Sequence, residues 1–391
     1  MRLVPFRYTL RSLVVRWSPS LFSALGIGLT VAVLGGVLAL REGFKALLSD
    51  TGSDDVVVYL RPGAQSEGES IVRYPVDTNV LKTRPEVALD ASGTPLAAAE
   101  SYLGLKLDRT DGTGTTIVTV RGVELPASLR IQGPRWRVVE GREPTPGSDE
   151  VVVGKPLTSR IKDTTIGSTL TFNVTPFKVV GIFENDGAYS SEIWGDVDRI
   201  CAALERPFRQ RFVAKLKPGT DVAAIATELE TDKRVPVKAQ TEKAYFAAQT
   251  TALGGVLGFL AGILTSLMGA AAVLGAVNTM LAAVGARTRE VGILMSVGYR
   301  RFPVFFCFLV EAAIIGLAGG LIGAVLVLPF NGLQTSTTNW NTFTEIAFAF
   351  RVTPSIIVTS IGVALVLGIL GGTVPAWRAS RLVPTAALRR L

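Results

Sequence analysis

AYFAAQTTALGGVLGFLAGILTSLMGAAAVLGAVNTMLAAVGA, residues 244–286, runs for 43 residues without a charged side chain. An α-helix crosses the hydrocarbon core of a bilayer in about 20 residues. Three further runs are long enough to do the same: Trp17–Leu40 and Val352–Trp377, which carry no charge, and Phe302–Phe350, which carries only Glu311 and Glu345. Together these runs predict an α-helical polytopic membrane protein with four transmembrane helices.

The run at 244–286 is too long for one span, because at about 1.5 Å per residue it would extend for roughly 65 Å. It is either a helical hairpin or one helix that continues outside the membrane. Arginine decides between them, since cytoplasmic segments are enriched in Lys and Arg. Arginine exceeds acidic residues in 1–19, 284–303 and 376–391. An even number of spans must therefore separate these segments, which one span satisfies and a hairpin does not.

The expected topology places both termini in the cytoplasm and one large insertion outside. Its segments, in chain order, are a cytoplasmic amphipathic N-terminal segment (1–19), the first span (20–41), an extracytoplasmic domain with its stalk (42–252), the second span (253–283), a cytoplasmic loop (284–302), the third span (303–329), a short extracytoplasmic loop (330–353), the fourth span (354–376) and a cytoplasmic tail (377–391).

The first run also resembles a cleaved signal peptide, but its apolar part, Leu21–Leu40, has 20 residues. The hydrophobic region of a signal peptide has about 7–15. No clear cleavage site follows it either. We therefore expect a signal anchor that stays attached.

Residues 42–252 are predicted to form an α+β domain between the first and second spans. Short runs rich in β-branched residues alternate there with Gly, Pro, Asp and Asn, as in Glu150–Val153 and Phe177–Phe183. The arginine-rich segments carry +11, so the total of +8 leaves −3 for this domain. The basic balance of the chain thus reflects topology, and no nucleic-acid partner is expected.

The composition excludes most catalytic chemistry. There is no histidine, and the two cysteines, Cys201 and Cys307, form no CxxC pattern. This removes His-dependent catalysis and the common zinc sites. No G-x-x-x-x-G-K-[ST] phosphate loop is present either. We expect no catalytic, cofactor-binding or metal site in this chain.

The cytoplasmic loop contains the most informative short segment, ARTREVGILMSVGYRR at 286–301. Val291, Leu294 and Val297 are spaced by three, so they should share one face of a short helix that Gly298 ends. This helix either lies in the lipid headgroups or docks in a groove on a cytoplasmic partner.

Glycines four residues apart mark the spans: Gly254, Gly258 and Gly262, then the pairs Gly316 and Gly320, Gly319 and Gly323, and Gly368 and Gly372. Small faces of this kind let helices approach closely. They serve either packing inside one four-helix unit or a dimer seam. Asn278 and Glu311 are polar residues inside the spans. For Glu311 we expect a hydrogen bond or ion pair to the 286–301 segment rather than a proton relay.

At this point the residues resemble the FtsX/MacB-type permeases of ABC transporters. The 286–301 segment is similar to the "RTREIGILRALG" coupling helix of that family. Pro375–Arg389 is similar to its "PARRAARLDPVEALR" ending, and Leu10–Leu13 to its amino-terminal element. Gly141–Glu143, Glu150–Gly154 and Val179–Phe183 resemble its MacB-type periplasmic domain. The coupling residues that the resemblance implies are Arg287, Arg289, Glu290, Val291, Ile293, Leu294, Val297 and Gly298.

The resemblance implies a permease subunit in the bacterial inner membrane that transmits ATP-driven motion to its periplasmic domain, for export or extraction of an envelope substrate. Its expected partners are two copies of a separate ABC ATPase that bind ATP and Mg, a second permease copy or a close paralogue, and a periplasmic adaptor or lipoprotein. The alternative is an FtsX-like signalling scaffold that activates a cell-envelope hydrolase.

Overall fold

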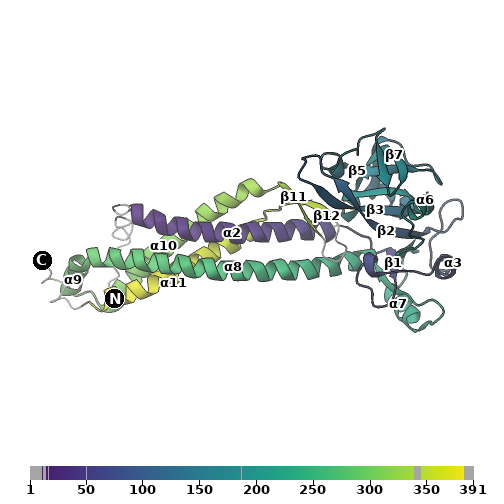
Figure 1. Ribbon diagram of the computed structural model, residues 1–391. Coiled ribbons are helices and arrows are strands. Elements are labelled where there is room, and N and C mark those ends of the chain that lie inside the picture. The colour runs from purple at the N-terminus through teal and green to yellow at the C-terminus, as the bar shows by residue number, and fades with distance from the viewer. Residues whose placement is uncertain are drawn as a thin grey trace. The chain divides into compact units, whose positions relative to one another are not determined.

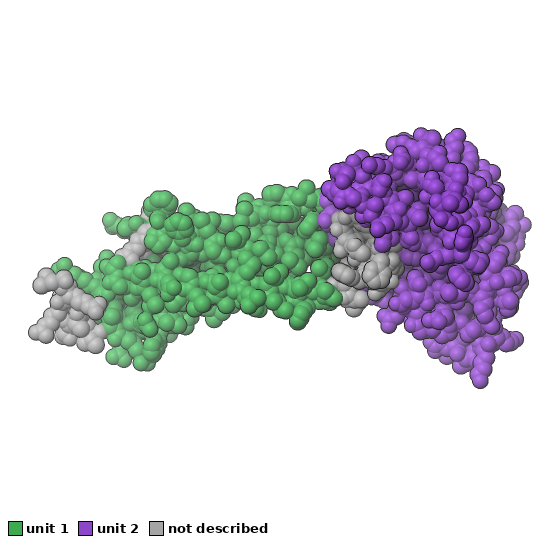
Figure 2. Space-filling view, in the orientation of Figure 1, with its two compact units in different colours: residues 1–44, 253–333, 349–391 green, residues 45–252, 334–348 purple. Residues whose placement is uncertain are grey.

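The computed structural model describes residues 11, 15, 17–49, 51–185, 187–338 and 345–382. The rest of the expected N-terminal segment and the family ending at 383–391 lie outside the described residues. The chain divides into two compact units, shown in green and purple in Figure 2. We name them the helical unit (1–44, 253–333 and 349–391) and the sheet unit (45–252 and 334–348).

Among the described residues, four helices are long and apolar enough to cross a membrane. They are α2 (Trp17–Ser49), α8 (Glu242–Ala286), α10 (Arg301–Val327) and α11 (Pro354–Ser380), with the short helix α9 (Thr288–Ser296) between α8 and α10 (Figure 1). The uncharged run at 244–286 is one continuous helix, as the single-span interpretation requires, and not a hairpin.

The helical unit is built around α10, which has small residues on two faces. On one face, a Cβ added to Gly316 would lie 2.7 Å from the carbonyl oxygen of Ala364 on α11. On the other, a Cβ added to Gly323 would lie 2.7 Å from the carbonyl oxygen of Gly28 on α2. Backbones come this close only where side chains are missing. The glycines of α10 therefore fix both α11 and α2 against it.

The described residues of the sheet unit form one mixed sheet in the order β10-β1-β9-β2-β3-β8-β5-β7-β4, with β6 paired to β7 (Figure 1). The strands are β1 (Val56–Leu60), β2 (Ala97–Asp108), β3 (Thr115–Val123), β4 (Trp136–Gly141), β5 (Glu150–Gly154), β6 (Thr169–Phe172), β7 (Thr175–Asn185), β8 (Glu192–Asp196), β9 (Arg211–Lys215) and β10 (Lys238–Thr241). Strands β3 and β8 run parallel, as do β5 and β7. Strand β10 lies at one edge.

Short helices connect these strands: α3 (Val76–Lys82), α4 (Ala127–Gln132), α5 (Lys155–Thr158), α6 (Val197–Ala203) and α7 (Val222–Thr231), with 3-10 turns η1 (Glu67–Glu69), η2 (Gly133–Arg135) and η3 (Ala188–Ser191). Asp196 and Asp221 begin α6 and α7, where each side chain accepts hydrogen bonds from two backbone amides of the first turn. Such caps satisfy amides that have no partner within the helix.

The sheet unit has two apolar cores. One packs α7 onto β1 and β9 through Tyr59, Phe212 and Ile225. The other packs α6 onto β3, β5 and β8, with Val151 and Ile193 completely buried. The predicted fold class, four transmembrane helices with an α+β domain inserted after the first, is confirmed. A small hairpin of β11 (Gln334–Thr338) and β12 (Glu345–Ala349) between α10 and α11 was not predicted.

The close contact of α10 with α11 predicts which glycines of α11 accept a side chain. A Cβ on Gly368 would lie 2.6 Å from the Cα of Gly316, whereas one on Gly362 would meet nothing within 4 Å. We expect Gly368→Val to lower the free energy of unfolding by about 1–3 kcal/mol through overpacking. Gly362→Val is the matched control and should change it far less. Thermal unfolding of both variants in the same detergent measures the difference, and equal midpoints would contradict the packing.

Candidate coupling site

The short helix α9 follows α8 after one turn residue and is ended by glycine. The amide of Gly298 donates to the carbonyl of Met295 at 3.2 Å, and Gly298 has a φ of +100°. A residue with a side chain rarely adopts this φ, so the glycine lets the chain leave the helix and turn into α10. The sequence correctly predicted a helix ended by Gly298.

Arg287 joins α9 to the third predicted span. Its guanidinium lies 3.2 Å from Glu311 of α10 and 3.2 Å from Glu290, and it stacks over the ring of Phe308 at 5.4 Å. Arg287 and Glu311 are only 3% and 5% exposed. The ion pair expected between Glu311 and the coupling segment is therefore present. A buried pair of this kind fixes geometry, because separating its members leaves an uncompensated charge.

The three apolar residues expected to share one docking face do not share one environment. Val291 is 1% exposed and packs with Val304, Phe308 and Ala376 inside the helical unit. Leu294 is half-buried, and Val297 is 75% exposed. The predicted docking face is therefore corrected, because Val291 does not belong to it. Spacing alone identified an amphipathic helix, but one side of α9 must cover the end of the bundle, and Val291 lies on that side.

The outer side of α9 is apolar at its centre and charged at its start. Ile293 is 48% exposed and stands four residues before Val297, so the two lie together on this side. Arg289 and Glu290 are also exposed. We define the outer face of α9 as Arg289, Ile293 and Val297. It presents two uncovered aliphatic side chains beside a cation, while Arg287 and Val291 hold the helix in place from behind.

The glycines named from the sequence fall into two groups. Gly316, Gly320, Gly323, Gly368 and Gly372 are buried at helix contacts within the helical unit. Gly254 and Gly258 meet only the side chain of Arg41, at 3.6 and 3.8 Å from an added Cβ, and Gly262 meets nothing within 4 Å. Of these three glycines, Gly254 is buried, Gly258 is half-buried and Gly262 is exposed. Asn278 is exposed on α8.

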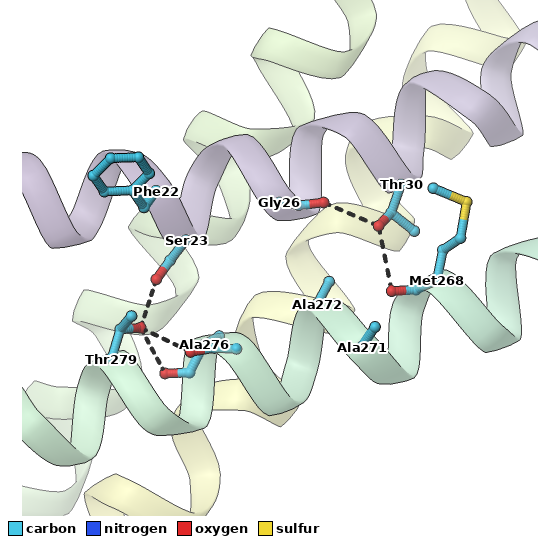
Figure 3. A pocket seen from close by; sticks show the side chains of 10 residues that line it. Phe22, Ser23, Gly26, Thr30, Met268, Ala271, Ala272, Ala276 and Thr279 are labelled. Carbon is cyan, nitrogen blue, oxygen red and sulfur yellow. Dashed lines mark hydrogen bonds between the residues drawn. The ribbon is translucent and has the colours of Figure 1, made fainter.

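A groove of about 430 Å³ separates α2 from α8 (Figure 3). Hydroxyl groups bridge it at both ends: Ser23 and Thr279 lie 2.6 Å apart, and Thr30 donates to the carbonyl of Met268 at 3.4 Å. These hydroxyl residues were not predicted from the sequence. Their signal was present, because hydroxyl groups inside apolar helices commonly form hydrogen bonds between helices.

The buried ion pair predicts a strong effect of single substitutions. Arg287→Met leaves Glu311 unpaired and should cost about 3–5 kcal/mol of stability. Replacing both residues, as Arg287→Met with Glu311→Leu, should recover most of this loss because no charge is then left buried. Arg289→Met removes an exposed arginine of the same loop and serves as control. Thermal unfolding of the four proteins tests the pair, and a double variant as unstable as Arg287→Met would contradict it.

Two family models match the chain. The MacB-like periplasmic core domain matches residues 20–232, and the FtsX-like permease C-terminal domain matches residues 262–384. The first match includes α2 and most of the sheet unit. The second includes most of α8 together with α9, α10 and α11.

Similar full-length proteins include a macrolide export ATP-binding/permease protein MacB of Bdellovibrio bacteriovorus, 27% identical over 94% of this chain and 58% of the relative. A pyoverdine export ATP-binding/permease protein PvdT of Pseudomonas savastanoi is 29% identical over 93% of this chain and 56% of the relative. The chain thus spans somewhat more than half the length of these relatives.

Among solved structures, the periplasmic region of MacB from Actinobacillus actinomycetemcomitans is 13% identical, with a TM-score of 0.37, and covers 49% of this chain and 91% of that one. The first family model covers more than half of the chain, and the second covers most of the remainder. The chain therefore belongs to the FtsX/MacB-like family of ABC transporter permeases, with four membrane helices and a MacB-like periplasmic domain inserted after the first.

Proposed function

We propose that this chain is the transmembrane subunit of an ABC transporter and that α9 receives the motion of an ATPase. The observation that carries this proposal is the division of α9 into two sides. Arg287 and Val291 fasten the helix to α10, while Ile293 and Val297 remain exposed. A helix that is fixed to the bundle on one side and exposes apolar residues on the other is suited to dock in a groove of a partner.

The exposed apolar side chains of Ile293 and Val297 can contribute measurably to the binding of a partner. Burying an aliphatic side chain of this size contributes roughly 1.5–3 kcal/mol. Arg289 adds a cation that can pair with an acidic rim on the partner. Because Arg287 is bonded to Glu311, a displacement of α9 also displaces α10. The glycine contacts of α10 then extend that displacement to α2 and α11.

The ATPase is proposed to be a separate subunit present in two copies, which binds the ATP and Mg. The relatives support an ATPase partner, since their names combine ATP binding with permease activity. A second permease copy would cover the part of α8 at Gly258 and Gly262, where these glycines are exposed or half-buried. The complex would lie in the bacterial inner membrane, where a periplasmic adaptor or lipoprotein is a further partner.

The work of the transporter is proposed to be mechanical. Closure of the ATPases moves the helices, and the helices move the periplasmic domain, which exports or extracts an envelope substrate. The match to a MacB-like core domain over residues 20–232 supports export rather than activation of a cell-envelope hydrolase. No specific substrate is assigned.

The orientation in the membrane follows from the arginine-rich segments and is tested by labelling. With Cys201 and Cys307 replaced by serine, a cysteine at the exposed position Thr113 should react with an impermeant maleimide in intact cells. A cysteine at the exposed position Ser296 should react only after the cells are opened. Labelling of intact cells at Ser296 but not at Thr113 would reverse the proposed topology.

Docking of α9 is tested by a charge on its outer face. Ile293→Asp places an unpaired carboxylate in the proposed contact and should cost several kcal/mol of ATPase binding, about a hundredfold or more in affinity. Because Ile293 is exposed, folding and membrane insertion should be unaffected. Recovery of the ATPase with affinity-tagged permease from detergent extracts measures the effect.

The control is Phe302→Asp, which adds the same charge at an exposed apolar residue of the first turn of α10. It reports any general effect of a carboxylate near the membrane surface. If α9 merely lies in the headgroups, Ile293→Asp and Phe302→Asp will retain the ATPase equally. That result would refute the coupling role of α9.

A further inference from the structure

The junction of strand β10 with helix α8 presents a mechanical difficulty. Strand β10 has four residues, lies at the edge of the sheet and, among the described residues, pairs only with β1. Helix α8 begins at the next residue, Glu242. A load at the end of an edge strand that pulls across the strand acts on its hydrogen bonds one after another. Motion of α8 passed through β10 alone would therefore peel this strand from the sheet.

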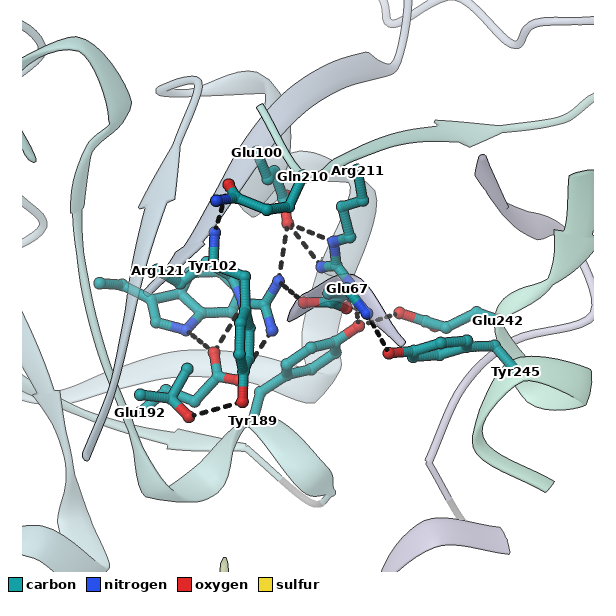
Figure 4. Close-up of polar contacts among 12 residues, drawn as sticks. Glu67, Glu100, Tyr102, Arg121, Tyr189, Glu192, Gln210, Arg211, Glu242 and Tyr245 are labelled. Atoms are coloured by element: carbon teal, nitrogen blue, oxygen red, sulfur yellow. Dashed lines mark hydrogen bonds and ion pairs between the residues drawn. The ribbon is translucent and has the colours of Figure 1, made fainter. Parts of the chain in front are cut away.

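The first turn of α8 has a second attachment that bypasses β10. Glu242 is completely buried, and its carboxylate accepts hydrogen bonds from the Tyr189 hydroxyl at 2.7 Å and from the Ser53 amide at 3.1 Å. One turn later, the Tyr245 hydroxyl accepts a hydrogen bond from the amide of Glu67 at 3.3 Å. Figure 4 shows both side chains beside Tyr189 and Glu67.

Tyr189 connects this turn to a buried network of charges. Its hydroxyl accepts from Arg211 at 2.9 Å, and Arg211 pairs with Glu67 at 2.6 Å and with Glu100 at 2.5 Å. Arg121 lies beside Arg211 and completes the network by pairing with the same Glu67, at 2.8 Å, and with Glu192, at 2.7 Å (Figure 4). Four of these charged residues come from β9, β2, β3 and β8, which are the neighbouring central strands of the sheet: Arg211, Glu100, Arg121 and Glu192.

The charged residues of this network stabilise one another in their ionised forms. Burial by itself raises the pKa of Glu67, but Arg121 and Arg211 outweigh it and keep that pKa below its usual value. Glu67 is therefore a carboxylate between two guanidinium groups. Such buried networks contribute little net stability compared with apolar packing, but they define geometry narrowly because every partner must be in place.

The backbone that enters the sheet unit after α2 also contacts the first turn of α8. The Lys243 amide donates to the Ser53 carbonyl at 3.4 Å. Gly52 has a φ of +93°, and a Cβ on it would lie 2.8 Å from the Lys243 nitrogen. The backbone at 52–53, which follows α2, and the first turn of α8 are therefore in direct contact, and Glu242 bonds to both this segment and Tyr189.

We propose that Glu242 and Tyr245 are positioning residues that anchor the first turn of α8 to the central strands, so that motion of α8 moves the sheet as one body. This inference rests on the proposed function, because it assigns the route by which helix motion reaches the periplasmic domain. Strand β10 is then protected from peeling, since the load is borne by several buried bonds at once rather than by its own bonds in sequence.

The test compares hydrogen–deuterium exchange at residues 238–241 with and without ATP turnover. It uses the full chain in nanodiscs with the ATPase recovered by pull-down. The variant is Glu242→Gln with Tyr245→Phe, which keeps side-chain shape while removing one charge and one hydroxyl. Tyr245→Phe alone is the milder variant should the double one fold poorly. The control is Lys243→Gln, which removes only the exposed pair with Asp54 in the same turn.

In the wild type and the control, exchange at β10 should be the same at rest and during turnover. In the anchor variants it should match the wild type at rest and rise during turnover by about tenfold, the factor expected for losing one hydrogen bond. An equal rise at rest and during turnover would show a merely structural role and overturn the anchor. Hydrogen–deuterium exchange at β10 that stays unchanged during turnover, in the double variant with the ATPase bound, would also overturn the anchor. Failure of the wild type to bind any ATPase would overturn the proposed function and this inference together.

Discussion

Helices that associate within lipid gain nothing from leaving water, so their packing depends on how closely their backbones approach. In this protein that constraint is met by α10, whose glycines contact α11 on one face and α2 on the other. Helix α8 has no comparable contact along Gly254, Gly258 and Gly262. The membrane part thus consists of three helices joined through the glycines of α10 and a fourth, α8, that packs on them through Met280 and Val284 and is bridged to α2 by hydroxyl groups.

Buried charged residues fix a helix at both ends of the proposed transmission path. At α9, a buried arginine–glutamate pair fixes a short helix whose other side stays free. At the start of α8, a buried network fixes a long helix to the centre of a sheet. In each place the charged residues fix the orientation of a helix rather than add net stability, because a buried ion pair tolerates few alternative geometries. The apolar cores at Phe212 and Ile193 supply the stability.

The spans, the inserted domain and the helix at 288–296 were predictable because hydropathy, charge and helical period are local properties of the sequence. The two sides of α9 were not, since Val291 and Val297 are chemically identical and only the bundle determines which one is covered. The network around Arg121 and Arg211 was missed for a different reason. A charged residue in a short strand is usually solvated, and the pairing of Arg211 with Glu67 joins residues 144 positions apart. The available signal was Arg121, which stands in a stretch rich in β-branched residues, Thr116–Val123.

The contact between Ser53 and Lys243 brings the two ends of the inserted domain together. A domain whose ends meet can be exchanged for another without changing the distance between the segments that it joins. The membrane helices and the outer domain of such a protein are therefore free to diverge separately. A lineage could acquire a larger, smaller or unrelated outer domain in a single recombination event and keep the same four helices beneath it.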